Sequence, residues 1–268
     1  MTNQHAAIQA VFFDLERVLV RCTRPRQELA IEGAQRLARW LQAQEVVVPA
    51  DLAEQWLAAR RFAAAKALQE QTENPADDVL AFVLQVHGCR DLPSAVLAQA
   101  VDLFFYPQLE HCGLVPGARE ALVALREGGR RLGVICNASS DRFIQSLVEH
   151  LGIRPYLDLV LTSAAARWRK PRREIFEMAL QRVDALGYEA VMVGGALDVM
   201  GAQAAGMWSV LIERPADVGR DIVGRGQVQP DAAISSLMEL LPLVERWSRQ
   251  WSWEYADEGD AAKADDEA

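Results

Sequence analysis

The sequence has no long apolar run, few cysteines and very few lysines, and each shortage narrows the class of protein. Apolar residues make up 51% of the 268 residues, yet no apolar run approaches the roughly 20 residues that a membrane-spanning helix needs. The N-terminal sequence MTNQHAAIQA has no basic segment ahead of an apolar one, so we expect no signal peptide. The cysteines lack CxxC spacing, which predicts free thiols in a reduced, cytoplasmic protein rather than a zinc site or a disulfide framework. They are Cys22, Cys89, Cys112 and Cys136.

The net charge of −9 is concentrated at the C-terminus. From Glu254 onwards seven acids accompany a single lysine, Lys263, which gives this segment a charge of −6. We expect residues 246–268 to form the end of an aromatic helix and then a disordered acidic tail. The rest of the chain is nearly neutral and lacks the broad basic face that binds nucleic acid. Lysine occurs only at positions 66, 170 and 263, so Lys170 stands out in the arginine-rich run RWRKPRR.

An aspartate follows the first apolar run of the chain. The segment AVFF, residues 10–13, predicts a strand buried on both faces, because a half-exposed strand would alternate apolar and polar residues. Asp14 then lies at the carboxyl end of that strand. Ligands of open α/β sheets bind at this edge, which makes Asp14 a candidate nucleophile or metal ligand. The alternative is an aspartate that only caps a helix or turn.

The remainder of the chain divides into a helical part and an alternating part. Helical periodicity predicts four helices in succession, at residues 27–44, 50–71, 76–86 and 93–106. Strands and helices then alternate, with strands predicted at 131–136, 157–161, 190–193 and 208–212 and helices at 116–128, 140–151, 172–186 and 199–205. Alternation predicts a parallel sheet with helices on both faces. We therefore expect an α/β core formed by residues 1–20 and 115–245 and a helical domain at 21–114.

Polar residues follow several of the predicted strands. Cys136 and Asn137 end one strand, Lys170 precedes the helix after the next, and Asp198 follows Gly194-Gly195 at the end of another. In a parallel sheet these positions share one edge with Asp14.

The order of these motifs resembles the haloacid dehalogenase superfamily. An aspartate, a helical insertion, LGVICNASS, RKPRREIFEMAL and VMVGGALDVMGAQAAGM follow one another over roughly residues 8–245. The resemblance implies a Rossmannoid α/β core with a helical-bundle cap inserted after the first strand. It further implies that Asp14 attacks the substrate to form an aspartyl intermediate, and that Lys170 neutralises charge between this aspartate and the substrate. Asn137 matches the asparagine after the second core strand, and Asp198 matches the later acid of the fourth motif.

The first motif departs from the pattern typical of the family's phosphatases. DLERV stands where D-x-D-G-[TV] is usual, so Glu16 replaces the aspartate that protonates the leaving oxygen and then activates water. Arg17 replaces a glycine and is expected to project towards the site or the cap. Cys136 replaces a Ser or Thr that donates to the phosphate, and a thiol is a weaker donor.

The fourth motif also departs from the pattern. Gly195 stands where an aspartate usually helps to bind Mg²⁺, and the loop is one or two residues shorter. Mg²⁺ can bind through only one or two protein carboxylates. We therefore expect Asp14 and Asp198 to form a weakened Mg²⁺ site.

Three functions follow from these matches and departures. The first is a phosphatase-type hydrolase of a small phosphorylated molecule, with Asp14, Glu16 and Lys170 catalytic, and with Arg17, Cys136 and Asn137 against the phosphate. The second is a catalytically inactive member of the fold that serves as a binding or regulatory module. The third is a metal-free dehalogenase-like hydrolase in which Asp14 attacks carbon.

One aromatic stripe lies near the C-terminus. Leu243, Trp247, Trp251 and Tyr255 recur every four residues, which places them on one face of a helix. The stripe either packs on its own domain or offers a docking surface to a protein partner or a second copy.

Overall fold

A six-stranded parallel sheet forms the centre of the molecule. The computed structural model describes residues 7–90, 92–213 and 228–249. The strand order is β5-β4-β1-β6-β7-β8, and every neighbouring pair is parallel. The predicted α/β class with a parallel sheet is confirmed. The strands are β1 (Ala10–Phe13), β4 (Arg131–Cys136), β5 (Leu159–Thr162), β6 (Ala190–Gly194), β7 (Trp208–Ile212) and β8 (Ala232–Ile234).

The central position of β1 fixes where a site can form. Phe13 is in register with Val134 of β4 and with Val193 of β6, so the loops that follow these strands flank Asp14 on both sides. The sheet order also reverses at this point, because β5 lies beyond β4 whereas β7 lies beyond β6. Such a reversal opens a crevice at the carboxyl edge of a parallel sheet. Asp14 therefore lies at the topological switch point.

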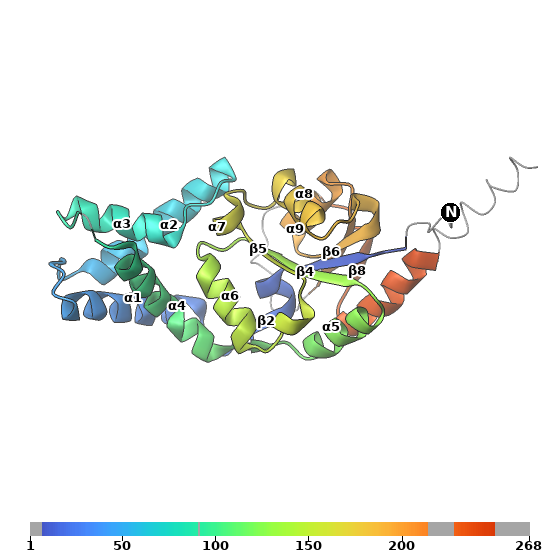
Figure 1. Ribbon diagram of the computed structural model, residues 1–268, viewed down its shortest axis with the longest axis horizontal. Coiled ribbons are helices and arrows are strands. Elements are labelled where there is room, and N and C mark those ends of the chain that lie inside the picture. Colours follow the sequence, from blue (N-terminus) through green and yellow to red (C-terminus); the bar gives the residue numbers. More distant parts are fainter. Residues whose placement is uncertain (1–6, 91, 214–227, 250–268) are drawn as a thin grey trace, which may run out of the picture.

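Helices cover both faces of the sheet, as Figure 1 shows. Side chains of β1 alternate between the two faces of the sheet. Val11 and Phe13 belong to the apolar core that includes residues of α5 and α6, whereas Ala10 and Phe12 belong to the core that includes residues of α8. All four residues are buried, which explains the uninterrupted apolar run. The helices of this domain are α5 (Ala118–Glu127), α6 (Asp141–His150), α7 (Ser163–Ala166), α8 (Arg173–Arg182) and α9 (Ala196–Ala204), with 3-10 turns at Arg154–Tyr156, Gly187–Glu189 and Leu237–Glu239.

Four helices form the cap at the other end of the molecule (Figure 1). They are α1 (Arg26–Ala43), α2 (Leu52–Glu70), α3 (Ala76–Val86) and α4 (Ser94–His111). Apolar side chains pack between them, with Trp56 edge-on to Phe104 at 5.4 Å between ring centroids. The helical cap inserted after the first strand agrees with the prediction. None of the helices in the described part of the chain is long and apolar enough to span a membrane.

Two short strands carry the chain into the cap and out of it. β2 (Val20–Cys22) pairs antiparallel with β3 (Cys112–Leu114) as a separate two-stranded sheet. Cys22 lies opposite Cys112, and their sulfurs form a disulfide. The prediction of four free thiols is therefore wrong for these two residues, because 90 residues separate them in the sequence and only the return of the chain brings them together. Cys89 and Cys136 are free.

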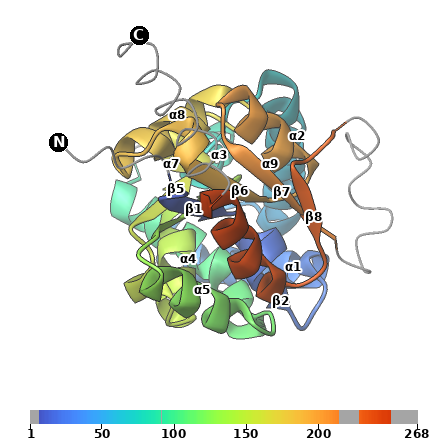
Figure 2. The same ribbon diagram turned by 90° about the vertical axis from the view of Figure 1, so that its right-hand side faces the viewer.

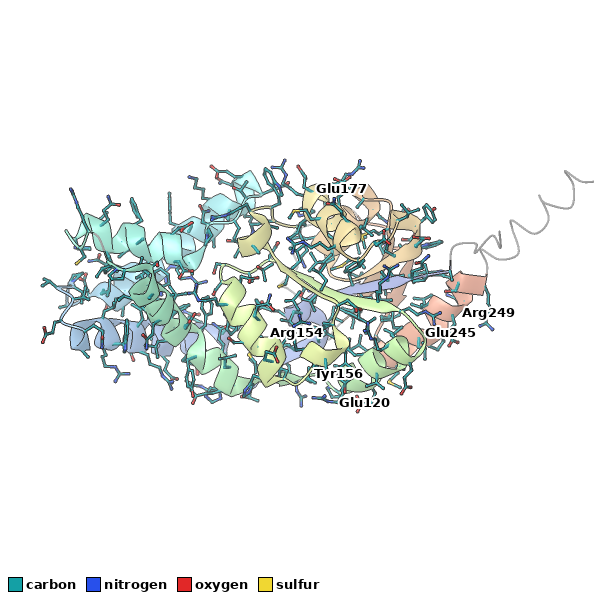
Figure 3. The ribbon with its side chains drawn as sticks, viewed as in Figure 1. Glu120, Arg154, Tyr156, Glu177, Glu245 and Arg249 are labelled. Carbon is teal, nitrogen blue, oxygen red and sulfur yellow. A yellow bond between two sulfur atoms is a disulfide. The ribbon has the colours of Figure 1, made fainter. Side chains whose placement is uncertain are left out.

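The helical residues 240–249 pack against the sheet at the end away from the cap (Figure 2). Trp247 is 5% exposed and stacks on Trp208 of β7 at 4.7 Å between ring centroids. Leu243 is buried in the same core. In Figure 3 this segment carries Glu245 and Arg249 on its outer side. The described half of the aromatic stripe thus packs on its own domain, whereas Trp251, Tyr255 and the acidic tail lie outside the described residues, and docking through them stays a prediction.

Candidate active site

Asp14 has two structural roles at once. It follows β1 and also caps a single turn of π-helix, η1 (Leu15–Leu19), where its Oδ1 accepts a hydrogen bond of 2.6 Å from the backbone N–H of Arg17. Leu15 and Val18 anchor this turn in the core. The capping alternative for Asp14 is therefore correct, but it does not exclude a role at the site. The cap fixes the carboxylate at the sheet edge and leaves Oδ2 for another partner.

Lys170 lies between two carboxylates. Its Nζ is 2.5 Å from Asp14 Oδ2 and 2.6 Å from Asp198 Oδ1, and it also donates to the backbone carbonyl of Ile135 at 2.8 Å. The lysine is 4% exposed. A buried ammonium is stable only when its charge and its donors are matched. The lysine singled out by its rarity thus forms a buried triad with the two predicted aspartates.

Burial and the mutual contacts of Asp14, Lys170 and Asp198 shift the pKa values of all three side chains. Burial opposes the charged form of Asp14, but the Lys170 ammonium and the Arg17 N–H outweigh this and hold the pKa of Asp14 below its ordinary value. Burial also opposes the charged form of Lys170, yet the two carboxylates raise its pKa. For Asp198 burial dominates over the attraction of Lys170 and raises the pKa to about 6. Asp14 is therefore an ionised carboxylate at neutral pH, as a nucleophile must be.

Asn137 and Cys136 both line the site, but their side chains make different contacts. The Asn137 side chain accepts from the Lys170 backbone N–H at 2.8 Å and donates to the Lys170 backbone carbonyl at 3.0 Å, so it holds the loop that carries the lysine. Cys136 is 2% exposed, and burial together with nearby Asp14 raises the pKa of its thiol. It stays a neutral, weak donor. Both residues line the site, where contact with phosphate stays a prediction.

The loop after β1 adds Glu16 and Arg17 to a cavity of about 270 Å³ over Asp14. Asn137, Lys170 and Asp198 line the same cavity, so the structure brings all predicted site residues together. Glu16 is also bound across the domain boundary, because its Oε1 is 2.6 Å from Arg26 at the start of α1. The carboxylate predicted to act on the leaving oxygen therefore also connects the core to the cap.

The fold family implies a Mg²⁺ ion here, and the donors around Asp14 and Asp198 do not fit one held between them. The Lys170 ammonium already lies between the two carboxylates. Asp198 Oδ2 accepts from the Gly195 N–H at 2.8 Å, which caps α9, and glycine supplies no carboxylate of its own. Across the described ranges no group of three or more His, Cys, Asp or Glu side chains is placed to hold a metal ion. The weakened Mg²⁺ site stays a prediction without a complete ligand set.

Residues 8–206 match the family model described as "Hydrolase: haloacid dehalogenase-like hydrolase". The chain belongs to this family. Among relatives, the ribulose-1,5-bisphosphate 5-phosphatase of Halopiger xanaduensis is 36% identical over 167 residues, which cover 60% of this chain and 69% of that protein. The human haloacid dehalogenase-like hydrolase domain-containing protein 3 is 37% identical over 134 residues, 49% of this chain and 52% of that protein. The match to the second thus spans about half of the relative's length.

Solved structures of this haloacid dehalogenase-like fold superpose over most of the chain. A 2-haloacid dehalogenase from Pseudomonas syringae pv. tomato gives a TM-score of 0.62 with 25% identity, covering 90% of this chain and 99% of that one. A phosphatase of the family from Thermococcus onnurineus gives 0.59 with 23% identity, covering 88% and 97%. The second likeness concerns the fold alone. Together they support the Rossmannoid core with an inserted cap.

The sequence offered Arg60 only as a loose candidate for an anion contact, together with Arg21, Arg24, Arg26 and Arg61, and it did not show which of these arginines reaches the site. Arg60 of α2 donates to Ser139 Oγ in the loop after β4 at 2.9 Å, and Arg169 pairs with Glu73 of the α2–α3 connection. These contacts depend on how α1 and α2 pack on the core, which no local pattern encodes. The signal in the sequence was the density of arginine at residues 21, 24, 26, 60 and 61, for which exposed helix surfaces were the stronger explanation.

Proposed function

We propose that this haloacid dehalogenase-like hydrolase is a phosphatase that acts on a small phosphorylated molecule through Asp14. The observation that carries the proposal is the position of the Asp14 carboxylate, whose Oδ2 lies 2.5 Å from Lys170 Nζ and which lines a cavity of about 270 Å³. The names of relatives support the reaction class. They include the phosphatase of Halopiger xanaduensis and a glyceraldehyde 3-phosphate phosphatase of Methanothermobacter thermautotrophicus, 34% identical over 131 residues that cover 47% of this chain and 58% of that protein.

The proposed reaction has two displacement steps. In the first, an Asp14 oxygen forms a bond to phosphorus while the bond from phosphorus to the ester oxygen breaks, and protonated Glu16 gives its proton to the leaving alcohol. In the second, Glu16 takes a proton from water, whose oxygen attacks phosphorus and releases phosphate from Asp14. Lys170 offsets the negative charge of the phosphoryl group throughout. Glu16 must leave its pair with Arg26 to serve in either step.

Hydrolysis of phenyl phosphate by the wild type and by Asp14→Asn tests the proposal. We expect the substitution to lower kcat by about 10³-fold or more, because it removes the nucleophile. Brief reaction and acid quench should show a phosphoryl mass on the Asp14 peptide of the wild type alone. Equal background rates for both proteins, with and without added Mg²⁺, would refute hydrolysis of phosphate esters.

A non-hydrolysing phosphate-binding module is the second candidate. It is favoured by Glu16, whose carboxylate pairs with Arg26, and by Asp198, whose Oδ2 accepts from the Gly195 N–H and whose Oδ1 faces Lys170. In that case inorganic phosphate binds, by calorimetric titration, while no ester is turned over. Halide release from 2-haloacids tests the dehalogenase-like alternative with the same two proteins.

A further inference from the structure

A second cavity adjoins the one over Asp14, between the cap and the core. It has a volume of about 240 Å³ and shares Glu16 and Asn137 with the first cavity. Its other walls come from both domains. They include Arg26, Arg60 and Phe105 of the cap and Ser139 and Phe143 of the core. A molecule with its phosphate on Asp14 would therefore extend past Glu16 and Asn137 into this space.

Arg60 enters this second cavity from α2, held by three aromatic rings. Its guanidinium carbon lies 4.5 Å from the centroid of Phe104, 5.0 Å from Phe105 and 5.6 Å from Trp56. Ring faces attract a cation and leave the edge of the guanidinium open for hydrogen bonds. One terminal nitrogen donates to Ser139 Oγ at 2.9 Å. The guanidinium has five N–H donors, and in the described part of the chain Ser139 is its one hydrogen-bond acceptor.

Neighbouring arginines differ from Arg60 because their charges are matched by acids. Arg26 pairs with Glu16 at 2.6 Å, and Arg169 pairs with the buried Glu73. Arg60 has no carboxylate within ion-pair distance among the residues described. Burial lowers the pKa of Arg60 to about 10, with Glu73 and Glu16 acting only at longer range. The side chain therefore stays cationic at neutral pH, and the desolvation of its charge is left without a nearby counter-ion.

We infer that Arg60 binds a second anionic group of the substrate, a carboxylate or a further phosphate on the alcohol side of the ester. This inference rests on the proposed phosphatase function and adds the substrate class. A carboxylate or phosphate would take up the remaining donors of the guanidinium and supply the missing counter-ion, and charge-assisted hydrogen bonds of this kind are the strong ones. Arg60 is then a specificity-determining residue contributed by the cap.

A series of ω-carboxyalkyl phosphates with one to four methylene groups tests the inference, each compared with the alkyl phosphate of the same length. We expect the wild type to favour one member of the carboxylated series by about 10- to 100-fold in kcat/KM, the size of one charge-assisted contact. Arg60→Gln should abolish this preference, so that the carboxylated phosphate and the alkyl phosphate of the same length react with similar kcat/KM. Arg60→Lys, which keeps the charge but not the fork, should keep part of the preference.

Arg61→Gln is the matched control, because Arg61 is the next residue of α2, is exposed, and lines neither the cavity over Asp14 nor the second cavity. It should keep the full preference. Absence of any carboxylate preference in the wild type, or its survival in Arg60→Gln, overturns the inference. Far-UV circular dichroism and urea denaturation of each variant show that the protein is folded.

Failure of the proposed function gives a different pattern. If no ester is hydrolysed, calorimetric titration compares propane-1,3-diol bisphosphate with 3-hydroxypropyl phosphate. Tighter binding of the bisphosphate by the wild type, lost in Arg60→Gln and kept in Arg61→Gln, upholds the second anion site without turnover. Equal binding of the two compounds, or no binding of either, overturns the assignment to Arg60.

Discussion

Lys170 carries its charge between two carboxylates at a depth where an unpaired charge is costly. Removing one partner of a buried ion pair costs about 3–5 kcal/mol, because the remaining charge keeps its desolvation penalty. Lys170 contacts both Asp14 and Asp198, so its loss leaves two such charges. The same charged side chains therefore serve the proposed reaction and stabilise the fold. A substitution at Lys170 tests their contribution to stability without any substrate.

We expect Lys170→Met to lower the free energy of unfolding at pH 7 by about 3–5 kcal/mol, measured by urea denaturation. The deficit should shrink at pH 4, since the two carboxyls lose their cation, their pKa values rise, and protonation then neutralises them. Lys66→Met is the control: Lys66 is exposed on α2 and lies 3.9 Å from Glu70, so a change below about 0.5 kcal/mol is expected. Equal losses of unfolding free energy in both variants would show that the triad stabilises the protein no more than an exposed ion pair does.

Asp198 should give stability a pH dependence of its own. Its pKa is raised to about 6 in the folded protein, from an ordinary value of 3.8, so between pH 4 and pH 6 the folded state binds more protons than the unfolded state. Stability must then fall as pH rises through this window. The groups that face Asp198 titrate elsewhere, because the pKa of Asp14 is lowered and those of Lys170 and Cys136 are raised.

Asp198→Asn removes this contribution. Between pH 4 and pH 6 we expect the wild type to lose about 1–3 kcal/mol of unfolding free energy relative to the variant. Urea denaturation of both proteins at half-unit pH intervals provides the measurement. Parallel curves for the two proteins across the window would contradict a raised pKa at Asp198.

At the scale of elements, β2 carries the chain from the core into the cap and β3 carries it back, and the Cys22–Cys112 disulfide joins the two strands at the cap side. A crosslink that closes a loop of about this length stabilises the folded protein by roughly 2–5 kcal/mol. In the loop-entropy account, it does so chiefly because it lowers the entropy of the unfolded chain. We expect Cys22→Ser to lower the unfolding free energy by that amount without reductant, and dithiothreitol to produce the same loss in the wild type.

Thiol titration in denaturant gives a direct count. The wild type should react at two thiols before reduction and at four after it, since Cys89 and Cys136 are free. Cys89→Ser serves as the control, with one thiol before reduction and little change in the effect of dithiothreitol. Four reactive thiols without reductant would mean that Cys22 and Cys112 are not joined in solution.

The same elements show which features a single sequence can predict. The strands at Arg131–Cys136 and Trp208–Ile212 agree with the predicted ranges because both are buried apolar runs bounded by polar residues or glycine. The helix at Ser94–His111 extends beyond the predicted end at residue 106, since it continues through the buried Pro107. Tertiary packing on α1 there outweighs the local cost of proline.

Features that depend on distant partners escaped prediction. The three-residue strands β2, β3 and β8 have no periodicity to detect. The site residues Asp14 and Lys170 could be placed because strand ends share one edge in a parallel sheet, and a family pattern carries both. Arg60 could not be placed, since its contacts with Ser139 and three rings arise only when α2 packs over the core.

Across the whole molecule, a seam of backbone contacts connects the cap to the loop that carries Lys170. Thr72 forms an isolated bridge with Trp168, the Glu73 N–H donates to the Arg167 carbonyl at 2.9 Å, and the Arg169 N–H donates to the Gln71 carbonyl at 3.0 Å. Glu73 strengthens the seam with its side chain, which accepts from Ser163 Oγ at 2.5 Å and from Arg169. Lys170 is the next residue after Arg169 of this seam, so a movement of the cap at these contacts would also move the loop that carries the lysine.

Glu73→Gln tests that connection, because the amide keeps the size of the carboxylate and removes its charge. Arg169 then loses its buried partner, and we expect the seam amides of Glu73 and Arg169 to exchange hydrogen about 10- to 100-fold faster, as a contact of roughly 1.5–3 kcal/mol disappears. Peptides from the sheet strands β1 and β6 should keep their protection, which separates cap opening from global unfolding. Glu70→Gln, three residues earlier and exposed on α2, should change neither. Unaltered exchange in the Glu73 variant would show that the ion pair between Glu73 and Arg169 adds nothing to the closure of the cap on the core.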